Sequence, residues 1–180
     1  MLYLKVALIL CTLFVWNSIR NGGIVMTVVV GEKAPEFTLL SNDGKRVQLK
    51  DFAGQNVVLY FYPKDMTPGC TTQACDFRDF HEDFSELNAV IIGVSPDPIN
   101  RHEKFIEKYN LPFLLLADET HEVAEAYGVW KLKKNFGKEY MGIERSTFIS
   151  NKEGIIVKEW RKVKVKGHVE EALTFIKQNS

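Results

Sequence analysis

Hydrophobic and polar positions after residue 26 follow two periods, and these predict strands and helices in alternation. Short continuous apolar runs rich in β-branched and aromatic residues are typical of strands that are buried on both faces of a sheet. These runs are 57–62, 89–94 and 113–116. Apolar residues at three- and four-residue steps predict helices with one buried face. These helices span roughly 70–87, 98–109, 123–127 and 169–176.

Two β-hairpins flank this alternating region. The first joins residues 36–40 to 46–49 through the turn Asn42-Asp43-Gly44, and the second joins 146–149 to 155–157 through residues 151–154. Turns of this composition between strand-like segments are typical of hairpins. The order is therefore a hairpin, three strand–helix units, a second hairpin and a last helix. It predicts an α/β fold of thioredoxin-like type, with a mixed central sheet flanked by helices and an N-terminal β-hairpin extension.

Composition and charge narrow the classes of function. The chain has 180 residues, of which 46% are hydrophobic and 26% charged, and this excludes a disordered or polytopic membrane protein. Lysine plus arginine number 23, as do aspartate plus glutamate, so the formal net charge is zero. A neutral chain has no strong field to gather nucleic acid, and we expect no nucleic-acid partner. No linker or repeat interrupts residues 26–180, which we expect to form one domain.

The first 25 residues differ from the rest of the chain. Residues 6–16 (VALILCTLFVW) form an apolar run of eleven residues, too short to span a bilayer, which takes about 20. The length suits a signal peptide, but no convincing cleavage site follows, and Leu10 makes a lipoprotein role for Cys11 weak. Two interpretations stay open: translation starts at Met26 or the extension is dispensable, or residues 1–25 serve export or anchoring. We expect a cytoplasmic domain, with export or anchoring left open by this segment.

Two of the three cysteines, Cys70 and Cys75, form a pair that needs an explanation. Cys70 lies where a buried strand has ended and a helix begins, and the amides and dipole of a helix start favour a charged thiolate. It is a candidate nucleophile, although a buried structural thiol is the alternative. Thr67 offers a nearby hydroxyl, and Pro63 and Pro68 stiffen the loop.

On a regular helix the Cα atoms of Cys70 and Cys75 would be about 8.5 Å apart. A disulfide does not close beyond roughly 7 Å between Cα atoms. Either the two cysteines are unrelated, or the first turns of the helix unwind when they bond. The second alternative describes a redox switch whose strained bond is easily reduced.

The pattern Pro63-x-x-x-Thr67-x-x-Cys70 resembles the active-site signature of the peroxiredoxins. The longer run from Tyr62 to Cys75 resembles the bacterioferritin comigratory protein, or peroxiredoxin Q, subfamily. The likeness extends over essentially everything after Met26. It includes the segments 93–97 (GVSPD), 127–130 (YGVW), 144–148 (ERSTF) and 164–168 (KVKGH).

This resemblance implies a thiol-specific peroxidase that reduces hydrogen peroxide and organic hydroperoxides without a metal or organic cofactor. It implies that Cys70 is the peroxidatic cysteine and becomes a sulfenic acid, and that Cys75 resolves it in an intramolecular disulfide that thioredoxin reduces. Thr67 would bind the peroxide and thiolate, Pro63 would shield the pocket from water, and Arg145 would hold the thiolate charged and polarise the peroxide. A resolving cysteine in the same chain needs no partner subunit, so we expect a monomer.

Other functions fit the residues less well. A thioredoxin-like disulfide oxidoreductase wants C-x-x-C, whereas four residues separate the cysteines here. A redox-sensing module would form the same disulfide with little turnover, and a binding domain with inert thiols would not react with peroxide. Zinc ligation by Cys70, Cys75 and His81 lacks close ligand spacing. The basic segment 161–166 alternates in polarity and predicts an exposed edge strand.

Overall fold

The computed structural model describes residues 28–135 and 137–179. The N-terminal extension of residues 1–25, with Cys11, lies outside the described residues, so the structure leaves both interpretations of it open. Among the helices of the described residues, none combines the length and apolar character needed to cross a membrane.

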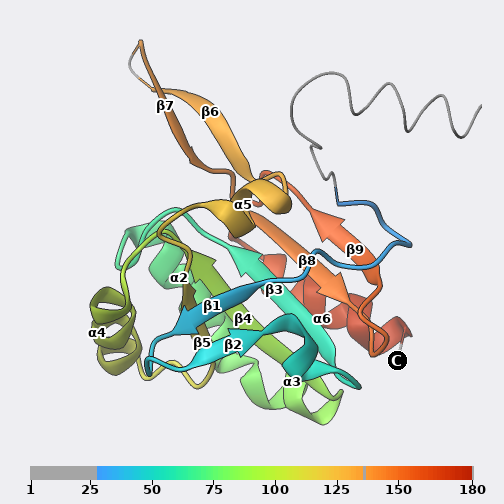
Figure 1. The fold of residues 1–180 in the computed structure, drawn as a ribbon. Coiled ribbons are helices and arrows are strands. Elements are labelled where there is room, and N and C mark those ends of the chain that lie inside the picture. The colour runs from blue at the N-terminus through green and yellow to red at the C-terminus, as the bar shows by residue number, and fades with distance from the viewer. Residues whose placement is uncertain (1–27, 136, 180) are drawn as a thin grey trace, which may run out of the picture.

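A seven-stranded mixed sheet forms the centre of the described structure, in the order β2-β1-β5-β4-β3-β8-β9 (Figure 1). Its strands are β1 (Thr38–Ser41), β2 (Arg46–Gln48), β3 (Asn56–Phe61), β4 (Ala89–Ser95), β5 (Leu114–Ala117), β8 (Ser146–Ser150) and β9 (Ile156–Trp160). The central strands β3, β4 and β5 are parallel, and the outer pairs are antiparallel. The predicted mixed sheet with an N-terminal hairpin is confirmed, and β1–β2 and β8–β9 are the two predicted hairpins.

Helices cover both faces of the sheet because the side chains of the buried strands alternate between two cores. The helices are α2 (Pro68–Asp79), α3 (His81–Glu86), α4 (Ile99–Tyr109), α5 (Glu122–Ala126) and α6 (His168–Asn179), with a short 3-10 helix, η1 (Leu49–Phe52). From β3, Tyr60 points into the core shared with α2, α3, α4 and α6. The next residue, Phe61, points into the core shared with α5 and the N-terminal hairpin.

The helix predicted over 70–87 is two helices, α2 and α3. Phe80 separates them, with a φ of −101° and a ψ of 11°, which ends the regular hydrogen bonding of α2. Phe77 and Phe84 on either side are fully buried in the same core. Because the buried face continues across the bend, the apolar periodicity gave no sign of the break.

The structure corrects the prediction for the segment after β9. Residues 161–166 form no strand, and the edge of the sheet on this side is β9. Lys162 has a φ of 52°, which is incompatible with an extended strand. The Arg161 guanidinium instead donates to the carbonyls of Tyr127 and Gly128, over 3.2 and 3.1 Å, and fastens the chain to the end of α5.

A two-stranded hairpin was not predicted and projects from the body of the protein (Figure 1). It consists of β6 (Trp130–Asn135) and β7 (Lys138–Ile143). Its exposed apolar residues, Leu132, Tyr140 and Met141, face no core, so the segment lacks the alternating pattern of a half-buried strand.

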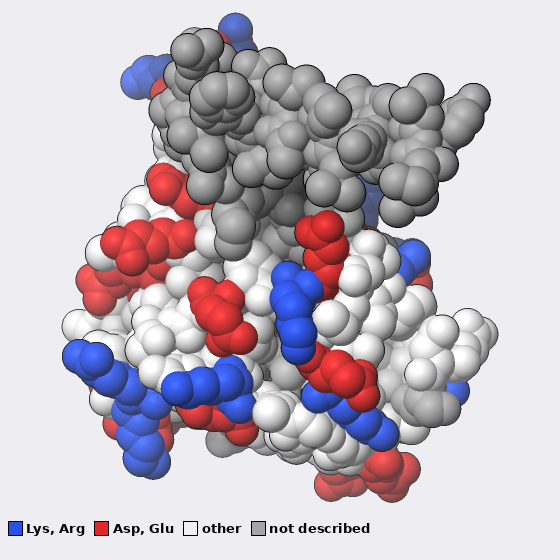
Figure 2. All heavy atoms as spheres, turned by 45° about the vertical axis from the view of Figure 1, so that its right-hand side comes forward, with Lys and Arg blue, Asp and Glu red and all other residues white. Residues whose placement is uncertain are grey.

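Over the face shown in Figure 2, basic and acidic side chains are interspersed, in keeping with their equal numbers in the sequence.

Candidate active site

The Cys70 thiol lies in the first turn of α2, just beyond the carboxyl end of β3. The strand ends at Phe61, and Pro63 lies in the following loop, since it has no amide hydrogen to extend the sheet. Pro68 is the first residue of α2, where its fixed φ suits a helix start. Cys70 is 1% exposed and carries a free thiol. The candidate nucleophile therefore lies among the unpaired amides at the positive end of a helix dipole.

Arg145 contacts this thiol from a distant part of the sequence. Its Nη2 donates to the Sγ of Cys70 over 3.1 Å. Arg145 directly precedes β8, which runs antiparallel to β3 with Ser146 opposite Phe61. This register brings the residue before β8 to the loop that follows β3. The structure thus brings together two of the residues selected from the sequence.

Gln73 holds Arg145 in place, and the sequence analysis did not select it. Its side chain is fully buried, and its Oε1 accepts a hydrogen bond from Nη1 of Arg145. Gln73 follows Cys70 by three residues, so the two side chains share one face of α2. The available sequence signal for Gln73 was its place one helical turn after a candidate nucleophile, on the buried face of the helix.

Thr67 and Pro63 lie in the loop between β3 and α2. Thr67 is the residue before the first turn of α2, with extended backbone angles. Its hydroxyl donates to the carbonyl of Lys64 over 3.0 Å and makes no hydrogen bond to Cys70. Pro63 is half-buried at the start of the loop. Both residues thus lie in the loop that leads to Cys70, and neither forms a hydrogen bond with its sulfur.

Cys75 lies on α2, five residues after Cys70, and is half-buried with a free thiol. Because both cysteines belong to one helix, they cannot bond until part of the helix opens. Within residues 28–135 and 137–179, no group of three or more histidine, cysteine, aspartate or glutamate side chains is arranged to hold a metal ion.

A network of buried polar residues supports the loop between β3 and α2. The sequence analysis did not predict this network. Asp65 is 1% exposed, and its carboxylate accepts a hydrogen bond from the Tyr62 hydroxyl over 2.6 Å. The Nδ1 of His102, on α4, lies 2.8 Å from the second carboxylate oxygen. The amide of Asp65 donates to Asp97 over 2.7 Å. No sequence signal links residues this far apart, because the contacts depend on the packing of α4.

Burial sets the charge states of other groups around the site. It raises the pKa of Tyr60 well above 10.0, and the nearby Asp65 adds to the rise, so this hydroxyl stays protonated. Burial also lowers the pKa of His168 from 6.5. The Nε2 of His168 lies 2.8 Å from the hydroxyl of Thr147, on β8. His168 is therefore neutral at physiological pH.

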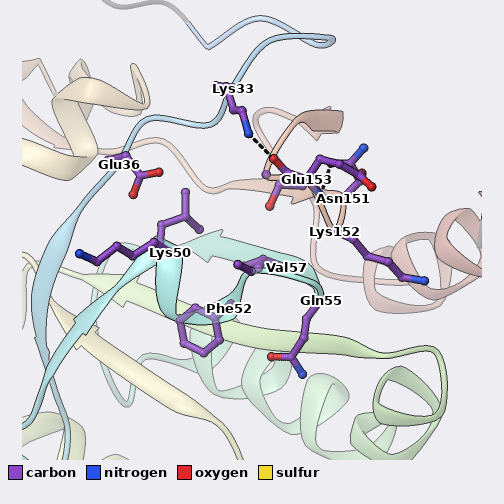
Figure 3. A pocket seen from close by; sticks show the side chains of 13 residues that line it. Lys33, Glu36, Lys50, Phe52, Gln55, Val57, Asn151, Lys152 and Glu153 are labelled. Carbon is purple, nitrogen blue, oxygen red and sulfur yellow. Dashed lines mark hydrogen bonds between the residues drawn. The ribbon is translucent and has the colours of Figure 1, made fainter.

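Figure 3 shows the residues that line a cavity of about 170 Å³. The cavity lies beside the start of β3, whereas Cys70 follows the end of that strand. Its walls include Val57, at the start of β3, and Ser150, at the end of β8. Lysines 33, 50 and 152 and glutamates 36 and 153 surround it, and Lys33 donates to the carbonyl of Glu153. It contains no cysteine, so it is separate from the thiol chemistry.

Comparisons with known proteins show the family of this chain. Residues 30–159 match the model of the AhpC/TSA family. The chain belongs to this family. It is 66% identical over 155 residues to peroxiredoxin Bcp of Bacillus subtilis, which covers 86% of this chain and 99% of the relative. It is 41% identical over 150 residues to peroxiredoxin Bcp of Escherichia coli, covering 83% of this chain and 96% of the relative.

Solved structures of peroxiredoxins have the same fold. The bacterioferritin comigratory protein of Xanthomonas campestris superposes with a TM-score of 0.77 at 40% identity, over 79% of this chain and 91% of that one. PrxQ of Xylella fastidiosa gives a TM-score of 0.81 at 35% identity, over 84% and 97%. The resemblance to peroxiredoxins and the thioredoxin-like fold are confirmed. This peroxiredoxin is a peroxidase, and the alternative of a disulfide oxidoreductase or redox sensor is not favoured.

Proposed function

We propose that this peroxiredoxin reduces hydrogen peroxide and organic hydroperoxides through Cys70, and that Cys75 and thioredoxin complete the cycle. The observation that carries the proposal is the contact of Arg145 with the buried sulfur of Cys70 at a helix start. The Xanthomonas campestris relative has been studied for alkyl peroxide reduction, which supports including organic hydroperoxides as substrates.

In the first step, the thiolate of Cys70 attacks one oxygen of the peroxide and the O–O bond breaks. Cys70 becomes a sulfenic acid, and the second oxygen leaves as water or an alcohol after taking up a proton. Arg145 stabilises the negative charge on the sulfur and then on the departing oxygen. The hydroxyl of Thr67 turns from the carbonyl of Lys64 towards the peroxide, and Pro63 limits the access of water.

In the second step, the thiolate of Cys75 attacks the sulfur of the Cys70 sulfenic acid and hydroxide leaves, to be protonated to water. The product is a Cys70–Cys75 disulfide, which requires the start of α2 to open. A dithiol of thioredoxin type then reduces this bond by thiol–disulfide exchange. No metal or organic cofactor takes part, since sulfur is oxidised and reduced throughout.

Residues 26–180 serve as the catalytic domain and act as a monomer. Support for one domain comes from the two cores, which together draw on residues from Val28 to Ile176. The monomer follows from a resolving cysteine in the same chain. A cytoplasmic location suits a cycle that returns both cysteines to free thiols, because that compartment keeps thiols reduced.

The test is peroxide consumption in the presence of thioredoxin, thioredoxin reductase and NADPH. The wild-type protein should consume hydrogen peroxide and cumene hydroperoxide over many turnovers, and Cys70→Ser should consume neither. Retained activity in Cys70→Ser would overturn the assignment of the nucleophile.

A further inference from the structure

The proposed disulfide poses a mechanical problem for α2. Cys70 and Cys75 lie in one helix, and their bond forms only if that helix opens around them. The helix also contributes Ala74 and Phe77 to the core, and both are fully buried. Opening of this stretch therefore releases two core residues, and opening that spreads beyond it would release the neighbouring elements as well. What limits the opening has to lie outside the stretch that carries the two cysteines.

The chain is fastened just before this stretch, at Asp65. Its amide donates to the carboxylate of Asp97 over 2.7 Å, and its carbonyl accepts from Arg101 over 3.2 Å. Its side chain lies 2.8 Å from Nδ1 of His102. Asp97 and Arg101 also form an ion pair at 3.0 Å, which ties the partners to one another. Arg101 and His102 lie in the first turn of α4, and Asp97 lies two residues before the helix.

The chain is fastened again just after this stretch, at Arg78. Its Nη1 donates over 3.0 Å to the carbonyl of Tyr109, the last residue of α4. Its guanidinium also pairs with Asp79 at 2.8 Å. The pKa of Arg78 is raised, first by the hydrogen bond to Asp79 and also by the neighbouring Cys75 thiol. The contacts of Arg78 therefore lie beside Cys75, the second cysteine.

Both sets of contacts include residues of the same helix, α4. α4 packs in the core that also holds α2 (Figure 1). Its residues His102 and Phe105 are fully buried. Met66, the first residue beyond Asp65, has a φ of 60°, a left-handed conformation that is strained for a side chain of this size. Opening the chain from Met66 onward relieves this strain, whereas opening it further back would break the contacts of Asp65.

From these contacts we infer that Asp65 and Arg78 are positioning residues that fix both ends of segment 66–77 to α4, so that disulfide formation unwinds this segment alone. The inference rests on the proposed Cys70–Cys75 disulfide. Fixed ends limit the length of chain that opens and return Cys70 to Arg145 when the bond is reduced. Contacts that persist in both redox states confine the change to the residues between them.

Hydrogen–deuterium exchange of the full chain tests this inference. The protein is oxidised with one equivalent of hydrogen peroxide, and intact mass and peptide mapping establish the Cys70–Cys75 bond before exchange begins. Absence of the bond would refute the proposed function, and this outcome is distinct from a failure of the contacts that Asp65 and Arg78 make. With the bond present, amides within 66–77 should lose protection and those of α3 and α4 should keep it. Loss of protection in α3 or α4 would overturn the inference.

Two variants at the end of α2 separate anchoring from general stability. In oxidised Arg78→Gln, exchange in α3 should rise about tenfold, the size of one lost charged hydrogen bond, while the reduced form stays close to wild type. Asp79→Asn removes the surface ion pair but leaves the contact of Arg78 with Tyr109, and it should match wild type in both states. An unchanged oxidised pattern in Arg78→Gln, or an equal rise in both redox states, would overturn the inference.

Discussion

Arg145 and Cys70 are 75 residues apart in the sequence, yet Nη2 of one donates to Sγ of the other over 3.1 Å. The antiparallel register of β8 on β3 makes this contact, and Gln73 orients the guanidinium from within α2. A cation this close to the sulfur favours its charged form, and in the proposed reaction it would also stabilise the oxygen that leaves. The surroundings of the Cys70 thiol therefore depend on the sheet as much as on the helix that carries the cysteine.

Replacing Arg145 by glutamine should lower the second-order rate constant with hydrogen peroxide by about 100-fold, as for the loss of one charge-stabilising donor. Arg145→Lys should recover part of the lost rate, because lysine keeps the positive charge but lacks the planar, forked guanidinium group. Stopped-flow fluorescence of the reduced protein measures the rate. The matched control, Arg46→Gln, removes an exposed arginine from β2 and should react at the wild-type rate. A rate within twofold of wild type for Arg145→Gln would contradict the role of Arg145.

Replacing Cys75 by serine should leave one peroxide turnover intact and stop recycling by thioredoxin. The first step needs only Cys70, whereas the disulfide needs both thiols. Mass spectrometry after trapping with dimedone should find the sulfenic acid on Cys70. Unchanged steady-state cycling would mean that another thiol resolves the intermediate.

Replacing Asp65 by alanine should lower the free energy of unfolding by about 3 kcal/mol, because it leaves the buried Tyr62 hydroxyl and His102 without their partner. Urea denaturation measures the change. Asp83→Ala is the control, since its contact with Lys177 is 3.5 Å long and exposed, and it should cost less than about 0.5 kcal/mol. Equal losses in the two variants would show that the Asp65 network adds no special stability.

The stability of the protein should fall as the pH drops below 6.5, in part because of His168. Burial lowers the pKa of this histidine in the folded state below 6.5, so the unfolded chain binds the proton first. Stability from this group is complete above pH 6.5 and is lost as the pH falls towards the lowered folded value. In urea denaturation at pH 7.5 and 5.5, wild type should lose more stability than His168→Gln. A larger loss in the variant would give the wrong sign.

The sequence predicted the elements whose signal is local. The buried strand before Pro63 and the helix start at Pro68 identified the position of Cys70 without any knowledge of the fold. The edge strand expected over 161–166 was wrong, because alternating lysine and valine resembles a half-exposed strand even where Lys162 has a positive φ. The β6–β7 hairpin was missed because, of its described residues, only Trp130 and Ile143, at its base, pack against the core.

The partners of the site were harder to predict because they come from distant elements. The resemblance to a family suggested Arg145, and the register of two strands explains its contact. Gln73 and the Asp65–His102 pair had no comparable signal, since their roles depend on how α2 and α4 pack on the sheet. Sequence patterns indicated Cys70 as a candidate nucleophile, and only the three-dimensional arrangement shows which residues contact it.

A peptide map of the reduced protein after one equivalent of hydrogen peroxide tests the central claim most directly. The account predicts rapid formation of a Cys70–Cys75 disulfide, which thioredoxin then removes, restoring two free thiols. Two untouched thiols after peroxide treatment would contradict the account and leave Cys70 and Cys75 as structural residues.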